Sequence, residues 1–86
     1  MKWIQKSKDK MECSIPEKKA YLFAVLERNR EGAWILSCKN LFDLPIMLHA
    51  KDQDSVCAEA TQMLHNIIFQ QIRELQQCAN AVGAAL

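Results

Sequence analysis

The fold of this chain is decided by one stretch of its sequence, KKAYLFAVLERNREGAWILSCKN, which spans residues 18–40. Two apolar runs, residues 20–26 and 33–38, flank a polar segment that ends in Gly32. Aromatic and β-branched residues enrich both runs, as they do in strands. A glycine can also adopt the positive φ that a tight connection needs. The stretch therefore predicts a β-hairpin.

The residues after the hairpin predict a third strand and then a helix. Residues 40–45 contain turn formers, and Pro45 disfavours a helical conformation in the residue before it. Apolar and polar side chains alternate over residues 46–50, which is typical of a strand. From about residue 55 to about residue 79, apolar residues instead recur three and four apart, as they do on one face of a helix.

The predicted helix is amphipathic and longer than the strands beside it. At ~1.5 Å per residue it is roughly 37 Å long, about twice the length of a typical strand. Its last turns and the tail at residues 80–86 are therefore expected to overhang the sheet. Asp54 or Ser55 is expected to cap its start. The apolar stripe comprises Val56, Ala60, Met63, Leu64, Ile67, Ile68, Ile72 and Leu75.

The N-terminal segment, residues 1–18, is polar, but Met11, Cys13 and Ile15 alternate in a way that fits an edge strand ending at Pro16. The whole pattern predicts the α+β class, with a three- or four-stranded antiparallel sheet packed on one long amphipathic helix. A chain of 86 residues forms one domain of this kind. Within residues 1–86, the sheet is expected at 20–51, the helix at 55–79 and the tail at 80–86.

Composition and charge exclude several classes of protein. Half of the residues are apolar and 24% are charged, which is typical of a globular domain. The net charge of +1 differs from that of a polyanion mimic or of a strongly basic nucleic-acid binder. No apolar run has the length of a membrane span or the character of a signal-peptide core. We therefore expect a cytoplasmic protein without a membrane segment.

Residues with catalytic or metal-binding potential are few and scattered. The sequence contains no nucleotide-binding, metalloprotease or serine-hydrolase motif, and Asp43, Asp52 and Asp54 occupy turn and cap positions that favour aspartate. His49 and His65 have no orienting partner in the pattern. The cysteines lack zinc-ligand spacing and are expected to be small buried hydrophobes in a reducing compartment; they are Cys13, Cys38, Cys57 and Cys78. We expect no enzymatic activity, no cofactor and no metal.

Both faces of the predicted hairpin are apolar, although the chain supplies a single long helix to cover them. If Arg28 lies opposite Ala33, alternation gathers six residues on one face, namely Tyr21, Phe23, Val25, Trp34, Leu36 and Cys38. The alanines of the other face leave room for the helix. Either Trp3, Ile4 and Met11 fold back over the tryptophan face, or that face docks on a second copy or on another protein. The candidate partner-binding residues are Tyr21, Phe23, Trp34 and Leu36 on this face, with Leu41 and Phe42 in the following loop.

The order of these features resembles HicB-like proteins, the antitoxin halves of bacterial toxin–antitoxin pairs. The matching parts are residues 21–27, Glu31-Gly32-Ala33-Trp34, Asp43-Leu44-Pro45 and residues 54–60, so the resemblance covers residues 20 to about 70. It implies a partial RNase H-like sheet packed on a helix, without the acidic centre of the nuclease. Ile46 stands where the family usually has a glycine after the proline. The DNA-binding segment that usually follows the helix has no counterpart in these 86 residues, so operator binding is not expected.

The preferred hypothesis is a non-enzymatic protein-binding domain that also forms a homodimer. Its expected partner is a toxin ribonuclease, or a host protein that the chain inhibits in the manner of a phage- or prophage-type inhibitor. The alternative is a small nucleic-acid-binding protein. Its contacts would come from Lys2, Lys6, Lys8, Lys10, Lys18, Lys19, Arg28 and Arg30. Binding to phosphates weakens steeply as salt rises, whereas apolar docking depends on salt much less.

Overall fold

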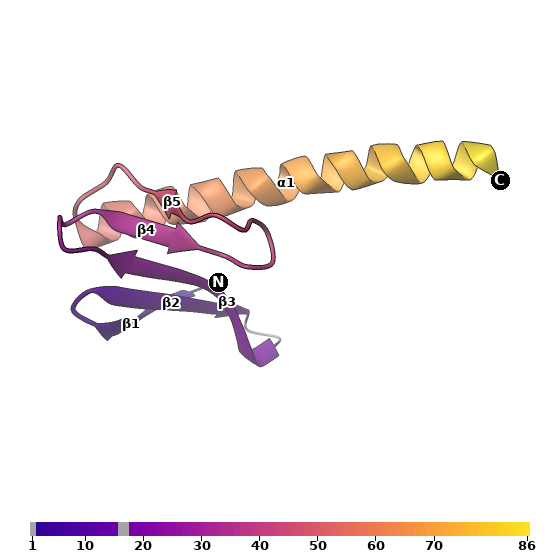
Figure 1. Ribbon diagram of the computed structural model, residues 1–86. Helices are drawn as coiled ribbons and strands as arrows, with labels where there is room; N and C mark the ends of the chain where they lie inside the picture. The colour runs from indigo at the N-terminus through magenta and orange to yellow at the C-terminus, as the bar shows by residue number, and fades with distance from the viewer. Residues whose placement is uncertain (1, 16–17) are drawn as a thin grey trace.

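The computed structural model describes residues 2–15 and 18–86, and it describes the side chains of these residues except 15 and 18–22. The strands and helix follow one another as β1 (Lys2–Ser7), β2 (Lys10–Ile15), β3 (Lys18–Arg28), β4 (Trp34–Ser37), β5 (Ile46–Met47) and α1 (Gln53–Ala85). The strands form one antiparallel sheet in chain order, and the first part of α1 packs on one of its faces (Figure 1). The predicted α+β class and the predicted hairpin are confirmed.

The N-terminal segment supplies a second hairpin that the sequence pattern did not reveal. β1 pairs with β2, which places Trp3 opposite Cys13, and β2 pairs with β3 in turn. The strand predicted around residues 11–15 is confirmed as β2, but β1 and not β2 forms the edge. The sheet therefore has five strands instead of three or four. Lys2 and Lys6 are exposed along β1, and such charges discourage one sheet edge from pairing with another.

A three-residue loop closes the hairpin between β3 and β4. The amide of Asn29 donates to the carbonyl of Ala33 over 2.8 Å, and Gly32 between them has a φ of 85°. The side chain of Asn29 also accepts from the amides of Glu31 and Ala33, at 3.0 and 2.9 Å. A connection of this length that ends in a left-handed glycine is common in hairpins.

This loop corrects the predicted pairing by one residue. Arg28 lies opposite Trp34 and not opposite Ala33, and Leu26 lies opposite Leu36. Because successive side chains of a strand point to opposite faces, the shift exchanges the two faces of β4. Trp34 and Leu36 therefore lie on the face that α1 covers, where both are 0% exposed. Their predicted position on a face turned away from the helix is wrong.

The core lies between this face of the sheet and the first turns of α1. Small residues in both layers, among them Ala24 and Ala60, let the helix approach the strands closely. From the N-terminal hairpin, Trp3 also packs here, and its indole Nε1 donates to Oγ1 of Thr61 over 3.0 Å. The buried apolar residues are Met11, Cys13, Ala24, Leu26, Trp34, Leu36, Cys38, Leu48, Val56, Ala60 and Leu64.

The helix is longer than predicted at both ends. Asp52 is its N-cap, because its carboxylate accepts from the amide of Ser55 over 3.0 Å; the expected caps Asp54 and Ser55 are instead helical residues. At the other end α1 continues to Ala85, so the residues expected to form a tail at 80–86 are almost all helical. Alanines are frequent there and favour the helix even without packing.

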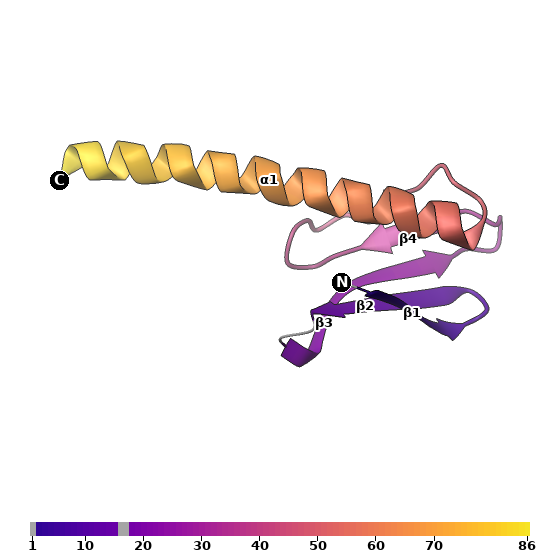
Figure 2. The same cartoon turned by 180° about the vertical axis from the view of Figure 1, so that it is seen from behind.

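Almost half of α1 projects beyond the sheet. Gln71 still touches the sheet half of the molecule, because its Nε2 donates to the carbonyl of Leu41 over 2.8 Å. Every residue from Ile72 onward is exposed. The molecule is accordingly elongated, with extents of 53 × 27 × 19 Å, and Figures 1 and 2 show the free rod from two sides. Within the described residues, no helix combines the length and the hydropathy needed to cross a membrane.

The strand predicted at residues 46–50 is shortened to β5. Its alternation is confirmed, since Leu48 is buried while Met47 and His49 are exposed. The amides of His49 and Ala50, however, donate to the carboxylate of Glu59 in α1, over distances of 2.8 to 3.1 Å. Glu59 thus fastens the loop after β5 to the helix.

Candidate protein-binding surface

Exposed apolar side chains concentrate in two regions of the described chain. One region is the sheet with the connection between β4 and β5, where Ile4, Met47 and the loop residue Leu44 are exposed. The other is the projecting part of α1 and the turns just before it, with Phe69, Ile72, Leu75, Val82 and Leu86. The two regions lie on different elements.

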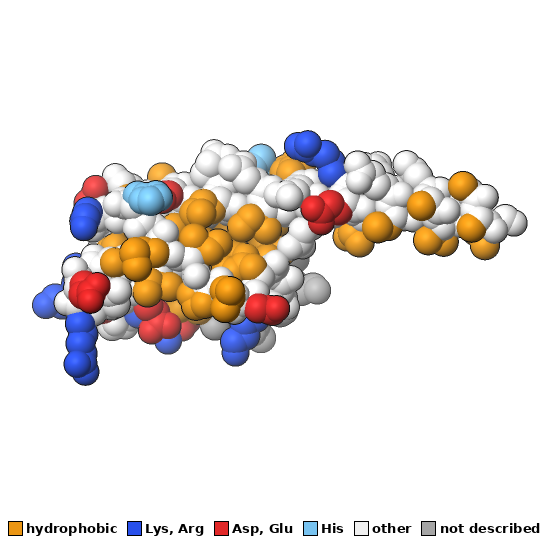
Figure 3. Space-filling view, turned by 45° about the horizontal axis from the view of Figure 1, so that its top comes forward, with side chains coloured by type: hydrophobic (Ala, Val, Ile, Leu, Met, Phe, Trp, Pro, Cys, Tyr) orange, Lys and Arg blue, Asp and Glu red, His pale blue; other side chains and the backbone are white. Residues whose placement is uncertain are grey.

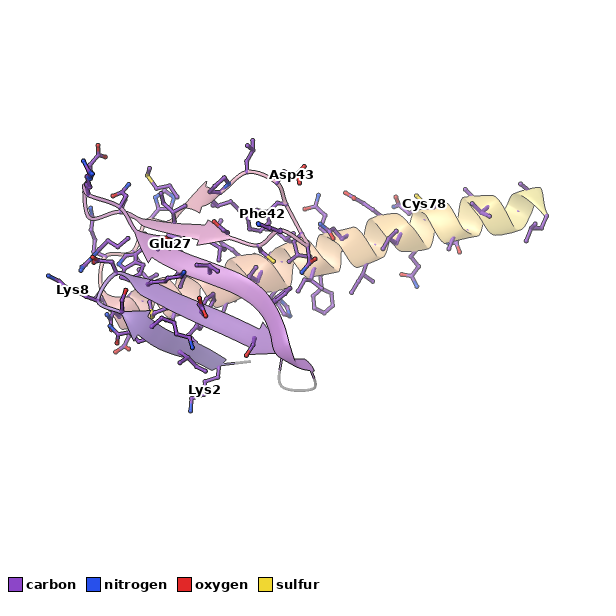
Figure 4. The ribbon with its side chains drawn as sticks, turned by 60° about the horizontal axis from the view of Figure 1, so that its bottom comes forward. Lys2, Lys8, Glu27, Phe42, Asp43 and Cys78 are labelled. Atoms are coloured by element: carbon purple, nitrogen blue, oxygen red, sulfur yellow. The ribbon has the colours of Figure 1, made fainter. Side chains whose placement is uncertain are left out.

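The sheet face opposite α1, here called the open face, carries an apolar patch. The pairing of the strands places Ile35 between Glu27 and Met47, and it places Val25 beside Ser37. No described element covers this face (Figure 4). We define the open-face patch as Phe23, Val25, Ile35, Leu44 and Met47. The first three are partly exposed, whereas Met47 is 60% and Leu44 79% exposed.

Two small hollows adjoin the patch. One of 160 Å³ is lined by Phe23, Val25, Ser37, Lys39 and Asn40. The other, of 170 Å³, is lined by Ser37, Cys38, Lys39, Phe42, Asp43, Leu44 and Pro45. They share Ser37 and Lys39, so they are neighbours. Both are smaller than the roughly 300 Å³ at which small-molecule sites begin, and each suits a side chain of a partner protein better than a cofactor.

Charged residues of both signs surround the patch. Glu27 lies on the open face beside Ile35, and Glu12 lies beside Val25. Lys10 is within 3.5 Å of Glu12. The predicted register implied a face that is apolar throughout. The open face instead has an apolar centre and a polar rim, as protein interfaces do.

The residues predicted to bind a partner are divided by the structure. Phe23 lies on the open face, and its side chain also packs against the edge of the core. Trp34 and Leu36 are buried beneath α1 and form no surface. The side chain of Tyr21 lies outside the described residues.

The loop residues Leu41 and Phe42 are only partly exposed. Their amides both donate to the carbonyl of Cys38 over 3.0 Å, and their side chains pack against the core. Phe42 also lines the 170 Å³ hollow, and Figure 4 shows it beside Asp43 in this loop. The loop is thus a fixed border of the patch.

The other patch residues were not predicted as partner-binding residues. Val25 was expected on the same face as Phe23, which the pairing confirms, whereas the one-residue error placed Ile35 on the helix face. Leu44 was expected in the connection before the third strand, and Met47 in that strand. Gly32 signals a tight connection, but such a connection can close after two or three residues, so the glycine does not by itself fix the pairing.

The face of the sheet that carries Trp34 is covered by α1 and by residues of the N-terminal hairpin. Trp3 and Met11 pack on it together with α1, as the fold-back alternative expected, but Ile4 points to the open face, where it is exposed. The indole Nε1 of Trp34 is buried without a hydrogen-bond partner among the described residues. Above its ring lies the guanidinium of Arg28, 5.5 Å from the ring centre.

In the described residues, the cysteine, histidine and acidic side chains that could react or bind a metal do not form a common site. The four cysteines are free, and burial raises the pKa of the Cys13, Cys38 and Cys57 thiols, which keeps them protonated. No group of three or more histidine, cysteine or acidic residues comes together there to hold a metal ion. His65 stacks at a tilt on Phe69, with ring centres 4.5 Å apart.

Some of the Lys and Arg side chains named for the alternative of nucleic-acid binding make contacts within the chain, whereas others are exposed. Arg28 donates through Nε to Asp9 over 2.7 Å and lies over Trp34, and Lys10 pairs with Glu12. Lys2, at the start of β1, and Lys8, in the turn after β1, are exposed on the β1 side of the sheet, away from Phe42 and Asp43 (Figure 4). The side chains of Lys18 and Lys19 lie outside the described residues.

Comparison of this chain with protein-family models, with curated proteins and with solved structures finds no match in any of the three.

Proposed function

We propose that this chain is a non-enzymatic protein-binding domain that docks on a partner protein through the open-face patch. The single observation that carries the proposal is the apolar centre of a sheet face that lies open to water. An antiparallel sheet with one solvated face normally alternates apolar and polar residues. Here Phe23, Val25, Ile35 and Met47 occupy positions on that face where polar residues would be expected.

The chemistry of the patch suits a partner that is itself a folded protein. Transfer of apolar surface from water contributes roughly 25 cal/mol per Å², and the adjoining hollows offer places for two partner side chains. The rim carries both signs of charge, in Lys10, Glu12 and Glu27. Such a rim contributes orientation and specificity more than affinity.

The class of partner is proposed from the resemblance of residues 20–70 to HicB-like antitoxins. In that reading the partner is a toxin ribonuclease, and the chain neutralises it by covering its surface. A host protein bound by a phage- or prophage-type inhibitor fits the same patch. The proposed compartment is the cytoplasm, because free thiols are typical of reducing conditions.

A pair of matched variants tests the proposal. Met47→Glu places a charge in the patch, and Ile4→Glu places the same charge on the open face beyond Glu12. Both positions are exposed, so both variants are expected to fold. Tagged wild type and each variant would be expressed in the native host, and the bound proteins would be identified by mass spectrometry and then purified for direct binding.

We expect one partner to bind the wild type and Ile4→Glu with similar affinity, and to bind Met47→Glu at least tenfold more weakly. For a toxin partner, the wild type would also suppress its ribonuclease activity in proportion to binding. Equal binding by all three proteins would reject the patch as the docking surface.

A further inference from the structure

The projecting part of α1 carries a second apolar surface with a regular repeat. Its large side chains follow a spacing of four and three residues in alternation, which is the heptad repeat of coiled coils. We define the helix seam as Ile68, Ile72, Leu75, Ala79, Val82 and Leu86. We propose that this seam pairs with the same seam of a second copy of the chain in an antiparallel two-helix coiled coil.

The seam continues the face by which α1 packs on the sheet. Leu64 is buried in the core and Ile68 is partly buried, whereas Ile72 is 49% and Leu75 68% exposed. The apolar stripe therefore runs on where the sheet ends. Figure 3 shows a row of hydrophobic side chains of the projecting part along the flank of the helix on which the sheet also lies, with others on its upper side near the free end.

The projecting part has little else to hold it in a helical conformation. Arg73 and Glu74 are the only charged residues in 66–86, and as chain neighbours they do not face each other. A helix of this length without tertiary contacts is marginal in water. A partner helix would supply the missing contacts.

The repeat itself favours a second copy as that partner. A coiled coil requires a 3.5-residue repeat on both helices, and the chain provides one. The positions that flank the seam are uncharged, so two copies do not repel each other, and a strongly charged partner finds no complement. These flanking positions are Phe69, Gln71, Gln76, Cys78, Gly83 and Ala85.

The area available is sufficient for a specific dimer. Five large exposed side chains on each copy, from Phe69 to Leu86, present on the order of 100 Å² each. A pair of copies would then remove roughly 1,000 Å² of apolar surface from water, which is where specific interfaces begin.

The position of the sheet fixes the orientation. It lies on the same flank of α1 as the seam, so a parallel partner would bring its own sheet into the space that the first sheet occupies (Figures 1 and 3). An antiparallel partner places the two sheets at opposite ends. In the register centred on Gln77, Ile68 meets Leu86, Ile72 meets Val82 and Leu75 meets Ala79, so that every seam residue has a counterpart.

Sedimentation equilibrium of two variants tests the pairing. Leu75→Glu places a charge in the seam, and Gln77→Glu places it on the opposite side of the same turn; both residues are exposed. We expect twice the mass of one chain for the wild type and for Gln77→Glu, and a single-chain mass for Leu75→Glu. A monomeric wild type, or a dimer that persists in Leu75→Glu, would overturn the proposal.

Cross-linking tests the orientation. Cys78 is exposed, and in the antiparallel register the two copies of this residue lie next to each other across the helix pair. A maleimide linker spanning about 10 Å, the distance between packed helix axes, is expected to join them. Moving the thiol with Cys78→Ser and Ala85→Cys separates the two thiols by about 24 Å along the axis and abolishes the cross-link. Equal cross-linking of both proteins would show a parallel pair and overturn the orientation.

This inference does not depend on the proposed docking surface. Met47→Glu is expected to keep the dimer, and Leu75→Glu is expected to keep the fold of the sheet, as judged by circular dichroism. Failure of one proposal therefore leaves the other intact.

Discussion

Arg28 and Trp34 lie opposite each other at the end of the β3–β4 hairpin, with the guanidinium carbon 5.5 Å from the centre of the indole ring. This pairing decides which hairpin side chains enter the core and which remain on the open face. It depends on the loop from Asn29 to Ala33, and the loop depends on the left-handed conformation of Gly32.

Replacing the two glycines by alanine is expected to have opposite effects. No atom lies within 4 Å of a Cβ added at Gly32 or at Gly83, so neither substitution creates a clash. Gly32 has a positive φ, and Gly32→Ala should lower the free energy of unfolding by about 1–2 kcal/mol. Gly83 is helical, and Gly83→Ala should strengthen α1 by up to about 1 kcal/mol. Urea unfolding and helix content by circular dichroism measure the two effects. A loss of stability in both variants would contradict the assigned backbone conformations.

Neighbouring residues of β4 are expected to differ in their importance for stability. Leu36→Ala removes a fully buried side chain and should cost about 2–5 kcal/mol. Ile35→Ala removes a partly exposed side chain of the open face and should cost less than about 1.5 kcal/mol. The denaturant concentrations at the unfolding midpoints of the two variants measure this difference in stability. The reverse order would mean that the pairing is shifted by one residue.

The carboxylate of Glu59 is expected to make stability dependent on acid. The amides of Ala50 and His49 hold the pKa of Glu59 below its ordinary value of 4.5. The stabilisation is therefore present above pH 4.5 and is lost as the pH falls through the lowered pKa of the folded state. Glu59→Gln should lose about 1 kcal/mol at neutral pH and should depend less on pH below 4.5.

Glu74→Gln is the control for this effect. The carboxylate of Glu74 accepts from the side chain of Gln70 over 3.4 Å on the exposed surface of α1. Its substitution should leave both the stability at neutral pH and the acid dependence close to those of the wild type. Equal acid profiles for wild type and Glu59→Gln would show that the contacts to Ala50 and His49 do not stabilise the fold.

The four cysteines are expected to react at very different rates. Cys78 is exposed on α1, whereas Cys13 and Cys38 are buried and Cys57 is partly buried beside Met11. Burial raises the pKa of these three thiols, which lowers the fraction of reactive thiolate. With a thiol reagent at neutral pH we expect one fast modification, absent in Cys78→Ser, and slow modification of the rest. Fast reaction of Cys13 or Cys38 would indicate that the core opens readily.

The sequence allowed the α+β class, the central hairpin and the existence of the helix to be predicted, because hydrophobic periodicity is strong there. It did not allow the pairing to be predicted. A connection that ends in Gly32 can close after two or three residues, and the bonds from Asn29 that select three are not visible in a pattern. One residue of error then moved Trp34 and Leu36 to the wrong face.

The start of the helix and the first strand of the sheet could not be predicted for similar physical reasons. Asp52, Asp54 and Ser55 are all good caps, and only the fold selects Asp52. β1 escaped notice because its lysines mask the two apolar residues Trp3 and Ile4. Of the open-face patch, Phe23 and Val25 were placed on one face correctly, and Met47 was placed on the side of its strand opposite Leu48, as observed. Ile35 was placed on the wrong face by the error in pairing.

The unbroken course of α1 from the core to its free end makes it a stiff spacer of about 50 Å, at ~1.5 Å for each of its 33 residues. Two copies joined at their spacers would hold two open-face patches at a fixed separation, one at each end of the rod. A target that displays its own docking site twice, at a matching distance, would then bind both patches at once. Such avidity raises the overall affinity although each patch makes the same contacts as it would alone.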